Sequence, residues 1–172
     1  TNLTGGRFPG ASLWRANLLQ AIVQDVDLSG TDLTEANFHA VNLSGSNFAG
    51  ATIVRASLTE TNMIGVNLSG ADLTGANLSE AKLHDADMRG ANMRKANLPT
   101  ADMTRANLAG ANFEGANLTW STMVDANLSG VNFSKADLGS ADLSGADLTG
   151  AILTGARLCK TKMPTGMDNS DC

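Results

Sequence analysis

An apolar side chain recurs at every fifth position of this 172-residue chain, from Leu3 to Met163. Glycine recurs four times less often, at residues 10, 30, 50, 70, 90, 110, 130 and 150. An α-helix rotates by about 500° over five residues, so it would scatter these apolar side chains around its surface. A flat β-strand would send alternate ones to opposite faces. Only a chain that turns a corner in every five-residue unit keeps all of them inside.

The glycine period indicates that four units complete one coil. The third residue of a type II turn needs a positive φ, which glycine adopts easily, and proline suits the second position. Pro9 and Gly10 follow this order. Corners without glycine, such as those at Glu35, Asp85 and Arg105, are therefore expected to use another turn geometry. Parallel backbone hydrogen bonds between coils about 4.8 Å apart would give a rod roughly 38 Å long.

Small residues precede the apolar positions by two, as Ala71, Ala76 and Ala81 do. Alternating small and large side chains would fill a narrow interior completely. The spacing places Phe113 directly under Phe133, and the methionines are interpreted as flexible core residues rather than metal or cofactor ligands. Asn and Asp exchange freely at the position before each apolar residue, which favours a solvated or backbone-bonding role over acid–base catalysis.

Two consecutive units, Ala71-Asp72-Leu73-Thr74-Gly75 and Ala76-Asn77-Leu78-Ser79-Glu80, resemble the A(D/N)LXX motif of the pentapeptide-repeat family. The resemblance covers residues 1–163 in one register. It implies an all-β fold, a right-handed quadrilateral parallel β-helix of about eight coils, with four units in each coil. Many members occur in cyanobacteria and thylakoid lumens without an assigned activity. A minority protect DNA gyrase by mimicking the shape and charge of B-DNA.

No unit carries an insertion, so no loop is expected to project and form a pocket. The sequence has no Ser-His-Asp spacing, P-loop or dinucleotide fingerprint. His39 and His84 are expected on different sides of the coil, without partners for a metal. We therefore predict a protein that is not an enzyme, with no catalytic residue, metal or cofactor. A net charge of −5 with mixed signs disfavours nucleic acid as a partner, and no apolar run is long enough to span a membrane.

Four cations, Arg15, Arg55, Lys95 and Lys135, recur on every second coil at one corner and predict a basic stripe, with Arg94 beside it. The favoured interpretation is a soluble surface of interspersed charges, and the alternative is an edge that binds an anion or a protein partner. Neighbouring columns mix aspartates with lysines and arginines. This mixture argues against the continuous acidic face that a DNA mimic needs.

Three apolar residues, Trp14, Leu19 and Ile22, occupy outward positions in the first coils. A fold-back cap or a junction with an upstream segment is the favoured explanation, and a partner site is the alternative. Trp120 is a further outward aromatic residue. We also expect the open ladder at this end of the rod to be covered by a second copy, a crystal neighbour or a segment before Thr1.

The repeat stops after Met163, and residues 164–172 are predicted to form a C-terminal capping tail. A disulfide between Cys159 and Cys172 would tie this tail across the end of the rod and contribute about 3 kcal/mol. The bridge would imply an exported protein in a periplasm or thylakoid lumen, whereas two reduced thiols would indicate the cytoplasm. The tail is too short to be the helical dimerisation module of gyrase-binding members.

The leading hypothesis is a non-catalytic structural scaffold that binds another protein. The candidate interaction surface contains Arg15, Arg55, Lys95, Lys135, Trp14, Leu19 and Ile22. The alternative is a DNA-mimic protein that binds DNA gyrase or another topoisomerase.

Overall fold

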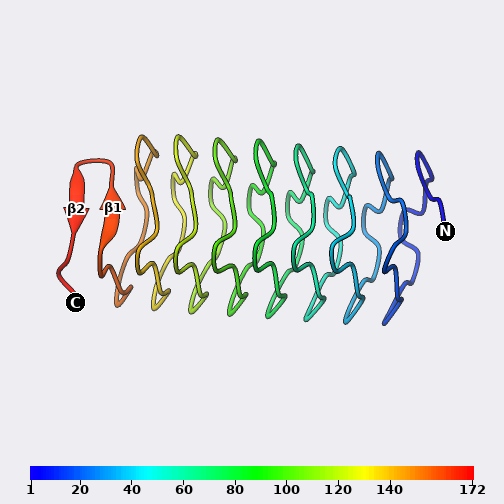
Figure 1. The fold of residues 1–172 in the computed structure, drawn as a ribbon, viewed down its shortest axis with the longest axis horizontal. Helices are drawn as coiled ribbons and strands as arrows, with labels where there is room; N and C mark the ends of the chain where they lie inside the picture. Colours follow the sequence, from blue (N-terminus) through cyan, green and yellow to red (C-terminus); the bar gives the residue numbers. More distant parts are fainter.

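The computed structural model describes residues 1–172, and it is a rod of stacked coils with the chain ends at opposite ends of the rod (Figure 1). Parallel bridges join each coil to the next, from Asn2 with Ile22 to Asp142 with Lys162. They are single-residue bridges because the corners leave only a short extended segment on each side. The predicted repeat solenoid is confirmed. The structure contains no helix with the length and apolarity that a membrane span requires.

The two longer strands lie at the far end of the rod. They are β1 (Thr161–Met163) and β2 (Gly166–Asp168), and they pair antiparallel with Thr161 opposite Asp168 and Met163 opposite Gly166. Strand β1 still continues the coil, since Lys162 bridges Asp142 in the preceding one. The antiparallel β2 therefore ends the parallel stack on this side (Figure 1).

One unit, residues 71–75, shows how the backbone groups are paired. The N–H groups of Leu73 and Gly75 donate to carbonyls of the next coil, and that of Asp72 donates to the previous coil. The Ala71 N–H closes the preceding corner. Only the N–H of Thr74 is left over, and Oδ1 of Asp72 accepts it at 3.0 Å. This side-chain acceptor completes the hydrogen bonding of the unit.

Most other units repeat this turn, which accounts for the free exchange of Asn and Asp. Either side chain supplies the oxygen, as Asn37 does for the His39 N–H at 3.1 Å. All three prolines, Pro9, Pro99 and Pro164, occupy the position of the left-over N–H, where a residue without that group loses no ladder bond. The predicted backbone-bonding role of Asn and Asp is confirmed.

Asn37→Ala is expected to lower the free energy of unfolding by about 1 kcal/mol, because the half-buried His39 N–H loses its acceptor. The matched variant Asn37→Asp keeps an acceptor oxygen in place and should remain within about 0.5 kcal/mol of the wild type. Urea denaturation measures both changes. Wild-type stability in the alanine variant would show that water replaces the side chain without cost.

Every corner places one residue in the left-handed backbone region. Each fifth residue from Gly5 to Lys160 has a φ between 54° and 71°, whether or not it is glycine. The expectation that Glu35, Asp85 and Arg105 would use another turn geometry is wrong, because their φ values of 59°, 56° and 57° are also left-handed. This conformation costs an L-residue about 1–2 kcal/mol. The ladder bonds on both sides of each corner hold it there.

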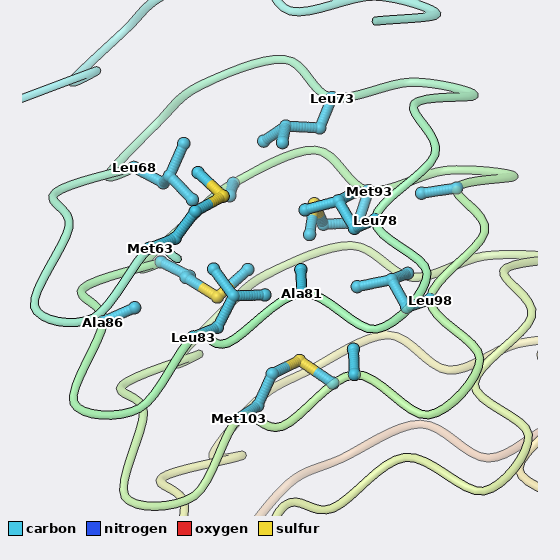
Figure 2. Close-up of a cluster of buried hydrophobic side chains, with 14 of the residues drawn as sticks. Met63, Leu68, Leu73, Leu78, Ala81, Leu83, Ala86, Met93, Leu98 and Met103 are labelled. Carbon is cyan, nitrogen blue, oxygen red and sulfur yellow. The ribbon is translucent and has the colours of Figure 1, made fainter. Parts of the chain in front are cut away.

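The interior is filled by the inward side chains. Phe113 lies against Phe133 with ring centroids 5.4 Å apart, as the spacing predicted. Met63, Met93 and Met103 are fully buried and pack among leucines (Figure 2), which confirms their role as core residues. No buried side-chain nitrogen or oxygen lacks a hydrogen-bond partner. Because the large inward side chains of the central coils are inaccessible to solvent, the rod is solid rather than a hollow tube.

Hydroxyl groups that replace alanine inside the rod also find partners. The Ser46 hydroxyl accepts the Val26 N–H at 3.1 Å and donates to the Val23 carbonyl at 2.9 Å. It thereby bridges a corner that elsewhere is closed by a direct backbone bond. The serine fits inside the dry core because neither of its hydrogen-bonding capacities is left unused.

The inward side chains of the two outermost coils are only partly buried. They are Leu3, Phe8, Leu13 and Leu18 at one end and Leu148, Leu153, Leu158 and Met163 at the other. Residues 1–20 form an ordinary coil, so they do not make the fold-back cap that was one explanation for Trp14, Leu19 and Ile22. At the far end, the predicted disulfide between Cys159 and Cys172 is present.

Candidate interaction surface

The outer surface has four sides, which we number by an inward residue of each. Side 1 lies around Leu83, side 2 around Met88, side 3 around Met93 and side 4 around Leu98, and each side continues through the equivalent residues of the coils above and below. Sides 2 and 4 are opposite each other. An edge is the corner between two sides.

The predicted basic stripe lies along the edge between sides 3 and 4, but the two cations of one half share a carboxylate. Arg15 Nε donates to Glu35 Oε2 at 2.6 Å, and Arg55 Nη2 donates to Glu35 Oε1 at 2.7 Å. Glu35 belongs to the same column but was not among the residues predicted for the stripe. Its position in the sequence, midway between Arg15 and Arg55, could have predicted that it contacts both arginines.

Hydrogen bonds from Arg15 and then Arg55 lower the pKa of Glu35 below its ordinary value. The two bonds therefore stabilise the fold at pH values above the pKa that Glu35 has in the unfolded chain. This contribution is lost as the pH falls through the lower pKa that Glu35 has in the folded protein. We expect an NMR titration of the Glu35 carboxyl in Arg15→Ala/Arg55→Ala to show a higher pKa than in the wild type. An identical pKa in both proteins would show that the arginines do not hold the carboxylate in solution.

The other half of the stripe is free of ion pairs. Arg94 bonds to Glu114 at 2.9 Å, whereas Lys95 and Lys135 form no ion pair with a carboxylate. A glycine stands at the same corner of the coil that follows each lysine, and Cγ of Lys95 would lie 3.8 Å from a Cβ at Gly115. The lysine stems therefore pass over glycines and leave their ammonium groups in solvent.

Two carboxylates on or beside the edge between sides 1 and 2, those of Asp85 and Asp87, are paired with cations. Arg105 makes two bonds of 2.8 Å to Asp85, and the pKa of Asp85 is lowered chiefly by this contact. Arg89 holds the Asp87 carboxylate in the same way at 2.8 and 2.6 Å. The acidic residues therefore do not form a continuous negative face. This agrees with the interspersed charges expected from the sequence.

The three apolar residues of the first coils do not form one patch. Trp14 lies on side 3, Leu19 on side 4 and Ile22 on side 1, because each five-residue unit of the chain advances by one side. The Arg15 guanidinium stacks on Trp14, 4.3 Å from the ring centroid. Proximity in the sequence had suggested a cluster, and the corners between these residues separate them.

Trp120 is the most exposed large apolar residue, with 67% of its surface accessible. It lies on the edge between sides 4 and 1, where Thr100 and Ser140 are its neighbours in the stack. Ile64 and Ile152 are further exposed apolar residues that were not predicted from the sequence. Both occupy positions usually held by Asn, Asp, Ser or Thr, and that departure from the repeat could have identified them.

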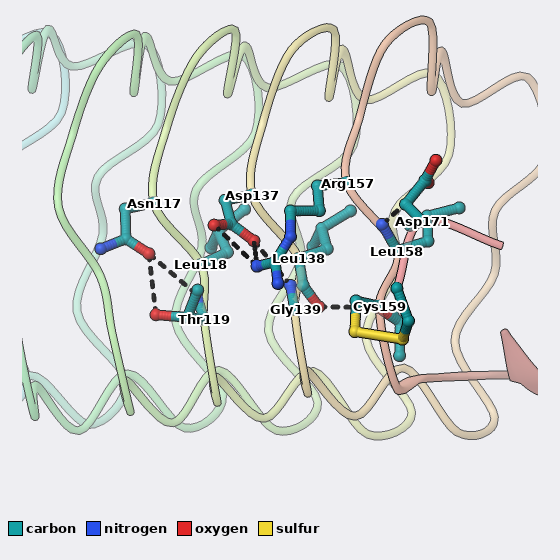
Figure 3. Close-up of polar contacts among 12 residues, drawn as sticks. Asn117, Leu118, Thr119, Asp137, Leu138, Gly139, Arg157, Leu158, Cys159 and Asp171 are labelled. Carbon is teal, nitrogen blue, oxygen red and sulfur yellow. Dashed lines mark hydrogen bonds and ion pairs between the residues drawn. A yellow bond between two sulfur atoms is a disulfide. The ribbon is translucent and has the colours of Figure 1, made fainter. Parts of the chain in front are cut away.

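Beyond Leu19 of the first coil, side 4 is mainly polar between its two edges. Asn117 Nδ2 donates to Asn97 Oδ1 at 2.9 Å, and Asn117 Oδ1 accepts from the Thr119 backbone and hydroxyl. Further along, Arg157 donates to Asp137 at 3.0 Å (Figure 3). These bonds keep the side chains close to the backbone. The lysines on one edge and Trp120 on the other therefore project beside a shallow platform.

The two histidines lie on different sides, as expected. His84 Nε2 lies 3.0 Å from Asp102 Oδ2 on side 1, in a surface depression that Lys82, Glu80 and Thr100 also line. No group of three or more His, Cys, Asp or Glu side chains is placed to hold a metal ion. Only apolar side chains and hydrogen-bonded hydroxyl side chains are buried in the interior.

Solved structures similar to this chain are themselves repeat proteins. HetL, a pentapeptide repeat protein involved in heterocyst differentiation regulation in the cyanobacterium Nostoc, is 33% identical over 96% of this chain and 86% of its own, with a TM-score of 0.36. A pentapeptide repeat protein from the thylakoid lumen of Arabidopsis thaliana is 33% identical over 62% of this chain and 70% of its own, with a TM-score of 0.37. QnrB1, a plasmid-mediated fluoroquinolone resistance protein, is 19% identical over 90% of this chain and 89% of its own, with a TM-score of 0.52.

No curated protein sequence matches the chain. The family described as pentapeptide repeats matches with eight copies, over residues 1–34, 31–70, 53–90, 61–105, 86–125 and 126–163. These matches cover the coils that the structure shows, and the chain belongs to the pentapeptide repeat family.

Proposed function

We propose that the chain is a non-catalytic scaffold that binds another protein through side 4 of the rod. One observation carries this proposal. The interior is completely filled, so recognition is left to the outer surface. In the right-handed, four-sided winding that the family implies, each side is a flat face held by the ladder. Such a face suits an extended protein surface better than a small molecule, which needs a concave site.

Side 4 combines features that favour a contact. Trp120 on one edge is a large, exposed and rigid side chain of the kind that dominates interface energetics. Lys95 and Lys135 on the other edge have unpaired charges, so the complementary partner surface would carry carboxylates. Arg15 and Arg55 contribute less in this proposal, because their guanidinium groups are already hydrogen-bonded to Glu35, which offsets one of their two charges.

Binding variants test this assignment. Trp120→Ala and Lys95→Glu/Lys135→Glu alter side 4, and Arg89→Glu on the opposite side is the control. The wild-type rod is first cross-linked to proteins in an extract of its source organism. The same proteins should no longer cross-link to the side-4 variants, and they should still cross-link to the control variant. Calorimetry with the purified partner should then show binding at least about 30-fold weaker for Trp120→Ala. Equal affinities for all variants would exclude side 4.

The alternative, a DNA mimic that inhibits or protects gyrase, has less support from the surface. Its acidic side chains are interrupted by Arg89 and Arg105, and the likeness to QnrB1 shows the fold alone. We expect no effect of micromolar protein on DNA supercoiling by gyrase. Inhibition, or protection against a quinolone, would favour the alternative over the scaffold.

We also infer that the protein works in an oxidising compartment, such as a periplasm or thylakoid lumen. The Cys159–Cys172 disulfide supports this inference, because cytosolic reductants keep most thiols reduced. A thiol titration under denaturing, non-reducing conditions tests it. Two free thiols in protein purified from its natural source would favour the cytoplasm.

A further inference from the structure

The tail, residues 164–172, is held to the rod by few contacts. Its β2 strand pairs with β1 through four backbone hydrogen bonds. Asp171 Oδ2 accepts the Leu158 N–H at 3.2 Å, and the disulfide joins Cys172 to Cys159 (Figure 3). Met167 is 60% exposed, so the tail buries little apolar surface of its own.

The Asp171 contact replaces a missing rung of the ladder. In the preceding coil the equivalent Leu138 N–H donates to the Arg157 carbonyl of the coil that follows it. Leu158 has no such carbonyl, and the Asp171 carboxylate takes its place. One exposed hydrogen bond contributes little by itself. The Cys159–Cys172 disulfide is therefore the main attachment that keeps residues 169–172 at the end of side 4.

We propose that the Cys159–Cys172 disulfide is a redox latch for this segment. Reduction by a dithiol would release residues 169–172 and uncover the ladder edge at Leu158, while the preceding coils keep their structure. The coils do not depend on the latch because each one contacts only its neighbours in the stack. The latch thus changes the end of side 4 without unfolding the rod.

The exchange reaction is chemically balanced. A thiolate of the dithiol attacks Sγ of Cys172, which is the exposed cysteine, and Cys159 leaves as a thiolate that takes up a proton. The second thiol of the reductant then attacks the mixed disulfide. This step closes the disulfide of the reductant and releases Cys172 as a thiol. Two electrons pass from the dithiol to the protein disulfide.

Hydrogen–deuterium exchange with mass spectrometry tests the latch on the full chain, oxidised and after reduction with dithiothreitol. The disulfide closes a loop between cysteines 13 positions apart, for which the chain-entropy model predicts roughly a hundredfold effect on local opening. We expect peptides that contain Leu158 or residues 169–172 to exchange faster after reduction, by up to about a hundredfold at the Leu158 amide. Peptides within residues 21–140 should be unchanged. Cys159→Ser/Cys172→Ser should behave as the reduced protein does.

The control is Asp171→Asn, which weakens the hydrogen bond to Leu158 and keeps the disulfide. It should exchange nearly as slowly as the oxidised wild type. Three results would overturn the proposal: no change in residues 156–172 on reduction, faster exchange throughout the rod, or an equal increase in the oxidised Asp171→Asn protein. The last result would identify the carboxylate, rather than the disulfide, as the attachment.

Discussion

Leu98→Asp is expected to lower the free energy of unfolding at pH 7 by at least about 4 kcal/mol. Leu98 is fully buried in the middle of the rod, among side chains that offer no partner for a charge. Burial favours the protonated form of a carboxyl and raises its pKa. Keeping an aspartate protonated at pH 7, about three units above its ordinary pKa, costs about 4 kcal/mol. The lost apolar contacts add to this cost.

The sign of the pH dependence follows from the raised pKa. The penalty is absent below the unfolded pKa near 3.9, where both states are protonated, and it grows as the pH rises. The matched variant Leu98→Asn carries a polar group that does not titrate. Urea denaturation from pH 4 to pH 8 should therefore show a stability difference between the two variants that widens with pH. A constant difference would mean that water reaches residue 98.

Phe113→Ala is expected to cost about 3–5 kcal/mol, because it leaves a cavity in an interior with no empty space to absorb it. The variant also removes one ring of the Phe113–Phe133 contact, whose centroids lie 5.4 Å apart. Neighbouring coils cannot close the gap without breaking ladder bonds on four sides.

Phe113→Leu is the control, since it keeps most of the volume and should cost less than about 1.5 kcal/mol. Urea denaturation followed by circular dichroism measures both proteins. A loss of less than about 1.5 kcal/mol in the alanine variant would contradict a tightly filled interior. A second transition would show that the gap divides the stack into two units that unfold separately.

The sequence predicted the coil and its core because both follow from position alone. The five-residue period places Phe113 beside Phe133, and the end of the repeat brings Cys172 back to Cys159. The corner conformation was less predictable. Local preference assigns a left-handed φ to glycine, whereas ladder bonds impose the same φ on Arg105. In this fold, tertiary hydrogen bonding overrides the preference of a single residue.

The surface was predicted less well than the core, for a different reason. Contacts there join residues of successive coils, as His84 with Asp102 and Arg15 with Glu35 do. Grouping by nearness in the sequence instead suggested a cluster of Trp14 and Leu19, which lie on different sides. The column of corners that predicted the basic stripe also contains Glu35, so reading every member of that column would have revealed the Glu35 pairs. The sequence could not show which side binds a partner, because the four sides have the same backbone and differ only in their exposed side chains.

The stacking of one coil on the next is tested most directly by NMR couplings across backbone hydrogen bonds. The structure predicts couplings from the Leu73 N–H to the Asn92 carbonyl and from the Asp72 N–H to the Ala51 carbonyl. Pairs with the same two spacings in the sequence should appear throughout the rod. Couplings between residues four apart, as in a helix, or ladder couplings at other spacings would contradict the coil and every inference drawn from it.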